Sequence, residues 1–413
     1  MSSNMDITFL GGLFPREIEE EIVANSIGNI DNAANVLQWN FINGLEANNG
    51  DPINIINSLY IGSYPKRYKK LYIKTSEFRK NVKSQNINVG FINIFGVKQY
   101  LRYFSIKKYL KLWANDKKEN KVIIAYALTS VFVKALKYIK MVNPNIKTCI
   151  IVPDLPEYMN TSDDVSKIYK ILKHIEIKSI SKNLKYIDNF VLLTEQMSKA
   201  LNVNNYIVVE GIATDILKQK DDKLKESKKS EKIILYTGTL NRRYGILNLI
   251  SAFRLIDNKD YRLILCGYGD SINEVLEAEK TDKRIIFKGQ IKREDVLQLQ
   301  NEADVLINPR QNKEEFTKYS FPSKNLEYLS SGTPLIAYKL DGIPTEYDDY
   351  IYYIENDSIE SLRDKIVEVC EKTREELNAA GKRAREFVLS EKNSIAQTKK
   401  IFDLLGEQND KKK

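Results

Sequence analysis

The chain has 413 residues, 43% hydrophobic and 29% charged, which is the composition of a folded protein with two domains rather than of a disordered or fibrous one. Its formal net charge of +9 is a modest excess that permits an anionic partner without choosing one. The single histidine, His174, excludes a zinc site built on several histidines. Three widely spaced cysteines predict buried free thiols in a reducing compartment.

The N-terminal sequence and the apolar runs predict a cytoplasmic protein. MSSNMDITFLGG lacks the basic region and the long apolar run of a signal peptide. The longest apolar stretch, residues 122–133, is too short to span a bilayer.

The first half alternates strand and helix patterns. Residues 7–10 predict a strand that ends in Gly11 and Gly12 and leads into a helix, as at the start of a doubly wound α/β domain. The two glycines would let a ligand approach the backbone, although a plain tight turn would use them equally well. Further strands are predicted at 53–59, 89–94, 122–127, 148–152, 190–193 and 207–209, with helices at 32–45, 98–118 and 131–141.

Asp154 and Glu157 follow the predicted strand 148–152 in the sequence PDLPEY. Functional residues of open α/β sheets lie beyond the carboxyl ends of strands, so both acids stand where catalytic carboxylates would stand. An ordinary Asp/Pro turn is the alternative.

Two basic, aromatic segments also occur in the first half. The helix predicted at 98–118 carries an apolar face flanked by lysines, and residues 65–70 read PKRYKK. A basic amphipathic helix favours contact with a membrane surface, and a core helix with solvated lysines is the alternative. No RNA-binding fingerprint accompanies these segments, so no nucleic-acid partner is expected. The predicted apolar face is Tyr103, Ile106, Leu110 and Trp113, and the flanking lysines are Lys98, Lys107, Lys108 and Lys111.

A charged segment, residues 217–232, separates the two halves. It contains almost no apolar residues and predicts a solvated linker. The predicted domains are therefore residues 1–216 and 233–390, followed at 391–413 by a last helix and a disordered tail.

The second half opens with a strand at 233–236 that runs into TGTLNRRYG. Here Gly238 precedes Arg242 and Arg243 at the start of a helix, an arrangement suited to phosphate because guanidinium forks and backbone N–H groups converge. Solvated arginines in a turn are the alternative. Strands at 263–265, 285–287 and 304–308 follow, with turns at Gly267 and Lys288.

The sequence SFPSKNLEYLSSGTPLI predicts a polar loop, a helix with Ser323 as its N-cap, and a strand at 335–337. The free N–H groups at a helix start form an anion site, to which Lys324 adds a charge. Glu327 adds a carboxylate that can accept hydrogen bonds from sugar hydroxyls. Because the carboxyl ends of parallel strands lie on one edge, this helix start should converge with the turns at 238–243 and 288–290.

The segments YTGTLNRRYGILNLISAF, LILCGYGD, IIFKGQ, ADVLINPR and SFPSKNLEYLSSGTPLIA resemble the donor domain of GT-B glycosyltransferases of the family 4 type, in its bacterial capsule and exopolysaccharide form. The resemblance implies an α/β fold with two doubly wound Rossmann-like domains facing across a cleft, the first for the acceptor and the second for the nucleotide sugar. It implies a last helix that packs back on the first domain.

The resemblance also implies a reaction: retaining, metal-independent transfer of a sugar from a UDP- or GDP-linked donor, with no further cofactor. The implied acceptor is a glycan or a lipid-linked sugar in surface polysaccharide synthesis. The basic segments, above all 98–118, would then suit contact with the inner membrane face.

Residue by residue, the resemblance places the diphosphate at Ser320, Ser323 and Lys324 and the ribose at Glu327. The family's first glutamate, which holds the donor sugar, falls on Tyr319, and its turn lysine falls on Tyr244. The implied donor-binding set is Gly238, Arg242, Arg243, Gly267, Lys288, Tyr319, Ser320, Ser323, Lys324 and Glu327. The implied catalytic residues are Asp154, Arg243 and Lys324, and those on the acceptor side are Gly11, Gly12 and Glu157.

Two other functions stay open at this point. A sugar-nucleotide 2-epimerase uses the same architecture, but it needs acid and base groups around the sugar that a single histidine fits poorly. A non-catalytic, glycosyltransferase-like binding subunit is the second alternative, because Tyr319 replaces the expected glutamate and a fold does not fix a function.

Overall fold

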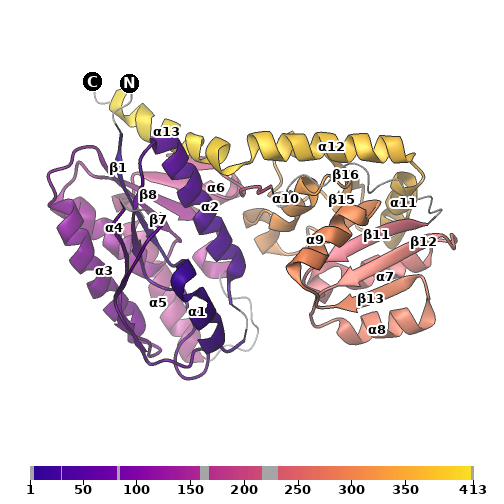
Figure 1. Ribbon diagram of the computed structural model, residues 1–413, viewed down its shortest axis with the longest axis horizontal. Coiled ribbons are helices and arrows are strands. Elements are labelled where there is room, and N and C mark those ends of the chain that lie inside the picture. The colour runs from indigo at the N-terminus through magenta and orange to yellow at the C-terminus, as the bar shows by residue number, and fades with distance from the viewer. Residues whose placement is uncertain (1–3, 29, 81–83, 159–166, 216–230, 411–413) are drawn as a thin grey trace. The chain divides into compact units, whose positions relative to one another are not determined.

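The computed structural model describes residues 4–28, 30–80, 84–158, 167–215 and 231–410, which form two compact units (Figure 1). The first unit takes its residues from 1–212 and 394–413, and the second from 213–393. Most of the predicted linker at 217–232 and the end of the predicted tail lie outside the described residues. Within the described part, no helix is long and apolar enough to cross a bilayer.

The first unit is built on an eight-stranded sheet in the order β10-β9-β8-β7-β1-β2-β5-β4. All its neighbouring strands are parallel except β4 and β5. The strands are β1 (Asp6–Gly11), β2 (Asn54–Asn57), β4 (Ser76–Phe78), β5 (Asn86–Asn88), β7 (Lys121–Tyr126), β8 (Lys147–Val152), β9 (Asn189–Leu192) and β10 (Tyr206–Val208).

Helices cover both faces of this sheet, with α2 and α13 packed on each other and α3, α4 and α5 in contact in turn (Figure 1). Phe9 of β1, Phe41 of α2 and Ile401 of α13 share one buried cluster, so the last helix completes the core of the first unit. The helices are α1 (Glu19–Asn25), α2 (Asn32–Asn49), α3 (Lys98–Ala114), α4 (Ser130–Val142), α5 (Lys167–Asn183), α6 (Gln196–Leu201) and α13 (Ser394–Asp410).

The second unit is a parallel six-stranded sheet in the order β13-β12-β11-β14-β15-β16. Counted from β11, this is the 3-2-1-4-5-6 order of a doubly wound nucleotide-binding fold, with its switch point between β11 and β14. Ligands of such sheets bind beyond the carboxyl ends of the strands at that point. The strands are β11 (Lys232–Thr237), β12 (Tyr261–Cys266), β13 (Ile285–Gly289), β14 (Val305–Asn308), β15 (Leu335–Tyr338) and β16 (Ile351–Ile354).

The helices α7 to α10 of the second unit connect its strands, α11 and α12 follow the last strand, and apolar residues of these helices belong to the buried core around the sheet. Leu249 and Phe253 of α7 and Leu329 of α10 are fully buried, which is the usual arrangement for amphipathic helices on a parallel sheet. The helices are α7 (Ile246–Arg254), α8 (Ile272–Thr281), α9 (Arg293–Glu302), α10 (Ser323–Ser330), α11 (Ile359–Cys370) and α12 (Arg374–Glu391).

The single strand predicted at 89–94 is wrong. β5 ends before it, and β6 (Phe91–Ile92) pairs instead with β3 (Tyr72–Ile73) in a separate small antiparallel sheet. Gly90 marks the break, because a Cβ there would lie 2.7 Å from the carbonyl oxygen of Ile73. An apolar run shows that residues are buried but not which sheet buries them.

Candidate functional site

Two glycines let three loops meet at the carboxyl edge of the second sheet. The N–H of Gly238 donates to the carbonyl oxygen of Cys266 at 2.8 Å, and the N–H of Gly267 donates to that of Gly289 at 2.8 Å. Gly238 and Gly267 have φ angles of 135° and 136°, which disfavour other residues. A Cβ on Gly267 would collide with the carbonyl oxygen of Gly238, and one on Gly238 would collide with Nζ of Lys324.

The helix α10 begins beside this edge, but its predicted N-cap is wrong. Pro322 occupies the cap position and Ser323 is the first helical residue, without a side-chain cap. Proline has a fixed φ and supplies only its carbonyl, which accepts the N–H of Asn325 at 2.8 Å. The start of α10 therefore keeps backbone N–H groups that no side chain of the cap residue satisfies, as an anion site requires.

Lys324 extends from the first turn of α10 to the end of β11. Its Nζ lies 3.3 Å from the hydroxyl of Tyr236 and 4.4 Å from the centroid of that ring. Burial lowers the pKa of Lys324 to about 8, with Arg310 acting in the same direction and Glu327 opposing them. The ammonium is therefore charged at neutral pH but poorly compensated.

Arg310, which directly follows β14 and Pro309, is a site residue that the sequence analysis missed. Its NH2 donates to Oγ of Ser320 at 2.7 Å, and its guanidinium lies 4.8 Å from the ring centroid of Phe316. Its Nε is buried and has no hydrogen-bond partner among the described residues, and burial lowers the pKa of this arginine. The position at a strand's carboxyl end was the signal that could have identified it.

Arg243 brings a third cation to the same place. Its guanidinium lies 5.5 Å from the ring centroid of Phe316, and Tyr244 also lies against both arginines. Within the described residues, neither Lys324 nor Arg310 forms an ion pair with a carboxylate. Cations held close together favour binding of an anion. We call Arg243, Arg310 and Lys324 the cation cluster.

Glu327 is held one turn further along α10. Its two carboxylate oxygens accept from Nε2 of Gln300 at 2.7 Å and from NH2 of Arg293 at 2.9 Å. Gln300 also donates to Oγ1 of Thr237 at 3.0 Å, which ties the carboxylate to the end of β11. The side chain remains 25% exposed, so a hydroxyl can still reach it.

Three other residues predicted to bind the donor do not belong to the cation cluster. Arg242 pairs with Glu274 of α8 rather than joining Arg243. Lys288 is exposed at the end of β13, and Tyr319 is half-buried at the end of a short 3₁₀ helix just before Ser320.

The predicted acceptor glycines lie at the carboxyl edge of the first sheet, where Gly11 is the last residue of β1 and Gly12 follows it. A Cβ on Gly12 would collide with the ring of Tyr60, so the close approach predicted for a ligand is made by this ring. The hydroxyl of Tyr60 donates to the carbonyl oxygen of Tyr126 at 2.7 Å and accepts the N–H of Ala127 at 2.9 Å. The glycine turn is thus fixed to the end of β7.

Asp154 follows β8 at the same edge of the first sheet. Its residue surface is open to solvent, yet the protein around the carboxyl group removes enough water to raise its pKa to about 6. The neighbouring carboxylate of Asp31 adds to this shift. A carboxyl group with such a pKa suits proton transfer near neutral pH. Glu157 is exposed one turn later.

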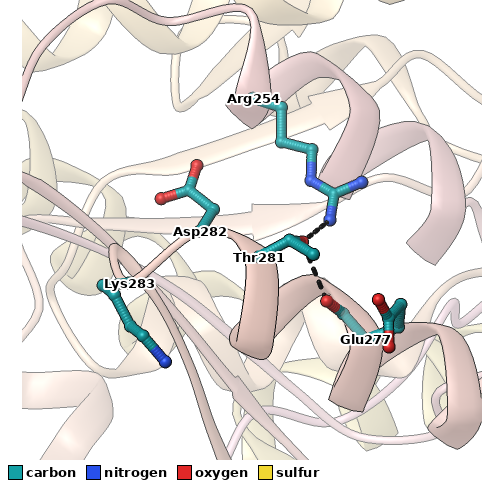
Figure 2. Close-up of a pocket in the computed structure, with 5 residues that line it drawn as sticks. All are labelled: Arg254, Glu277, Thr281, Asp282 and Lys283. Atoms are coloured by element: carbon teal, nitrogen blue, oxygen red, sulfur yellow. Dashed lines mark hydrogen bonds between the residues drawn. The ribbon is translucent and has the colours of Figure 1, made fainter.

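A surface pocket of about 510 Å³ lies elsewhere in the second unit, at the C-terminal ends of α7 and α8 (Figure 2). Arg254 donates to Oγ1 of Thr281, which donates to the carbonyl oxygen of Glu277 at 2.8 Å. Because α8 leads from here into β13, the pocket lies at the opposite edge of the sheet from Gly238 and has no part in the site. Its lining residues are Arg254, Glu277, Thr281, Asp282 and Lys283.

The order of the second sheet and its edge of glycines and cations indicate a nucleotide site, and comparison with known proteins identifies the enzyme class. Residues 217–387 match the model of the family described as glycosyl transferases group 1. The chain has the GT-B fold and carries a glycosyltransferase domain. Its second unit is the glycosyl transferases group 1 domain, which the resemblance of SFPSKNLEYLSSGTPLIA predicted.

Solved structures share the fold of both units of this chain. Sucrose-phosphate synthase from Thermosynechococcus elongatus is 16% identical with a TM-score of 0.63, over 98% of this chain and 99% of that one. Anabaena HepE in complex with UDP is 12% identical with a TM-score of 0.62, over 98% and 100%. The lipopolysaccharide outer core galactosyltransferase WaaB is 12% identical with a TM-score of 0.60, over 98% and 100%. A comparison with curated protein sequences finds no match.

Proposed function

We propose that the protein transfers a sugar from a nucleotide diphosphate sugar, with retention of configuration, and that the cation cluster holds the diphosphate. The observation that carries this proposal is the convergence of three cations on the uncapped start of α10, at the switch point of the second sheet. When the bond between C1 of the sugar and the β-phosphate oxygen breaks, negative charge grows on that phosphate. Preorganised cations and N–H groups stabilise such charge.

The acceptor hydroxyl then forms the new bond to C1 and loses its proton. We assign Asp154 to orient this hydroxyl and to take up the proton, because its carboxyl group is at the strand end and has a raised pKa. Gly11, Gly12 and Glu157 are assigned to the acceptor side of the same edge. For transfer, the hydroxyl bound by the first unit must reach the sugar bound by the second.

Glu327 is assigned to the ribose hydroxyls, and its replacement by glutamine should weaken donor binding. We expect KM for the nucleotide sugar to rise about tenfold with a smaller change in kcat, because the carboxylate forms charge-assisted hydrogen bonds in both ground and transition states. Steady-state kinetics with the donor and with its 2′,3′-dideoxyribose analogue measure this. The variant should discriminate less between the two donors, and full discrimination by the variant would contradict the ribose assignment.

The sugar end of the donor site is assigned to Tyr319, with Ser320 on the diphosphate, and the nucleoside is uridine or guanosine. HepE is described in complex with UDP, and an Escherichia coli trehalose-6-phosphate structure is bound with UDP-2-fluoro glucose, which supports UDP as the first donor to test. WaaB acts on a lipopolysaccharide outer core, which supports a role in bacterial surface polysaccharide assembly, with a glycan or lipid-linked acceptor at the inner membrane face.

Incubation of the purified protein with a panel of UDP- and GDP-linked sugars tests the proposal. Release of nucleoside diphosphate is the expected result. An altered sugar without net nucleotide release would instead indicate epimerisation. Absence of both binding and turnover with every donor would indicate a binding subunit.

A further inference from the structure

A group of exposed aromatic and aliphatic side chains surrounds the start of α3. The exposed fractions are 66% for Tyr72, 56% for Phe95 and 65% for Tyr100. Scattered apolar residues are normal on a protein surface, but a contiguous group indicates an interaction site. We call this group the apolar rim, and it consists of Tyr64, Tyr72, Ile94, Phe95, Val97, Tyr100 and Phe104.

Backbone pairing and ring contacts join these side chains into one surface. Tyr64 and Ile94 form a β-bridge, in which the N–H of Tyr64 donates to the carbonyl oxygen of Asn93 at 2.9 Å. Tyr72 lies in β3, which pairs with β6 just before Ile94. The rings of Tyr100 and Phe104, one turn apart on α3, have centroids 4.6 Å apart.

The same bridge brings the basic segment 65–70 beside the rim. The sequence predicted this segment and the helix at 98–118 as separate patches, but Lys98 Nζ also donates to the carbonyl oxygen of Ile61 at 3.0 Å. Lys66 and Arg67 are exposed, and within the described residues neither pairs with a carboxylate. The apolar rim is therefore bordered by uncompensated positive charge.

The rim differs from the apolar face predicted on this helix. Ile106 and Leu110 are fully buried, and Nε1 of Trp113 donates to Asp6 of β1 at 2.8 Å. That face packs on the core of the first unit, as in the core-helix alternative, so it is not available to a membrane. The exposed stripe of α3 runs instead through Tyr100, Phe104 and Lys108.

We propose that the apolar rim inserts into the headgroup region of an anionic lipid bilayer while the cations of 65–70 contact lipid phosphates. Self-association through the rim would bring Lys66 and Arg67 of two copies together, so a negatively charged surface is the better complement. The inference rests on the proposed function, because it names the surface from which the acceptor is taken. The helix α3 begins at the carboxyl edge of the first sheet, the edge that carries Asp154.

Co-sedimentation of the full chain with lipid vesicles tests this proposal. We expect binding to vesicles that contain phosphatidylglycerol and much weaker binding to pure phosphatidylcholine. Combining Phe95→Ser, Tyr100→Ser and Phe104→Ser should weaken vesicle binding about tenfold or more, since apolar insertion is lost. Combining Lys66→Glu, Arg67→Glu and Lys69→Glu should weaken it about a hundredfold at low salt.

Matched controls use exposed residues outside the rim. Val36→Ser with Leu255→Ser, and Lys280→Glu with Lys382→Glu, should leave vesicle binding unchanged. Circular dichroism and UDP calorimetry check that each variant folds and keeps its donor site. If the native chain does not bind UDP, the proposed function is contradicted. The vesicle experiment then still tests separately whether the apolar rim binds a membrane.

Two results would overturn the rim proposal. The first is vesicle binding that is absent in the native chain or unaffected by the Phe95, Tyr100 and Phe104 substitutions. The second is a native dimer in light scattering that these substitutions convert to a monomer, because the rim would then be an interface between copies.

Discussion

Replacing Lys324 by methionine should lower kcat for nucleotide-sugar turnover by about 10²–10³-fold, the usual effect of removing one group that stabilises charge on the reacting atoms. Methionine keeps the length and apolar stem of the side chain but removes the ammonium that lies against Tyr236. Arg310→Gln should have a similar effect, because its guanidinium contacts Ser320 in the same cluster. Initial rates of nucleoside diphosphate release measure both losses.

Charge and position can be separated within this experiment. Lys324→Arg keeps the positive charge, so it should retain more activity than Lys324→Met. Arg242→Gln should cost less than Arg310→Gln because Arg242 is paired with Glu274. The exposed Lys280→Met is the neutral control. Equal rates for Lys280→Met and Lys324→Met would remove Lys324 from the site.

The pKa of Lys324 adds a pH dependence to donor binding. Its value of about 8 means that the ammonium loses its proton as the pH rises through 8. The affinity for UDP should therefore fall above that pH, and Lys324→Arg, which stays charged, should remove this fall. Calorimetric titration of UDP at a series of pH values measures the change.

Replacing Asp154 by asparagine should reduce kcat about 10²–10⁴-fold, the range over which a positioned general base contributes. Its pKa is raised to about 6, so the native enzyme should lose activity as the pH falls through 6 and the carboxylate is protonated. The pH profile of kcat/KM should show this acidic limb, which reports a group of the free enzyme. Residual activity of Asp154→Asn should lack the limb.

Asp31 offers a matched control for this pH profile. Burial is the main cause of the raised pKa of Asp154, and the charge of Asp31 is the second. Asp31→Asn removes that charge but keeps an N-cap for α2, where the aspartate accepts the N–H of Ala34 at 3.0 Å. The acidic limb should move to lower pH in this variant while the enzyme stays folded. A limb that stays in place would assign the titration to another group.

Much of the fold follows from local sequence pattern. Continuous apolar runs such as residues 122–127 predict buried parallel strands. Gly238 and Gly267 mark the ends of two of the strands in the second sheet. The helix predicted at 32–45 continues to Asn49, where Gly50 ends it with a φ of 75°. Pairing between short strands was not predictable: the break at Gly90 depends on contact with Ile73, which is distant in the sequence.

Site residues that belong to a sequence motif could be predicted. Site residues whose position depends on tertiary contacts could not. The sequence predicted that Lys324 lies near Gly238, because the carboxyl ends of parallel strands share one edge of the sheet, and a Cβ on Gly238 would indeed collide with Nζ of Lys324. It could not place Arg310, whose role comes from Phe316 and Ser320 folding back on it. The N-cap at Ser323 failed because Pro322 already occupies that position.

The crystal structure of the enzyme with UDP or GDP tests the central claim most directly, since it shows where the diphosphate lies. The β-phosphate should lie within hydrogen-bonding distance of Lys324 and Arg310 at the start of α10, with the ribose hydroxyls on Glu327. A diphosphate bound away from the cation cluster, or a nucleotide that occupies another edge of the second sheet, would contradict the donor site described above.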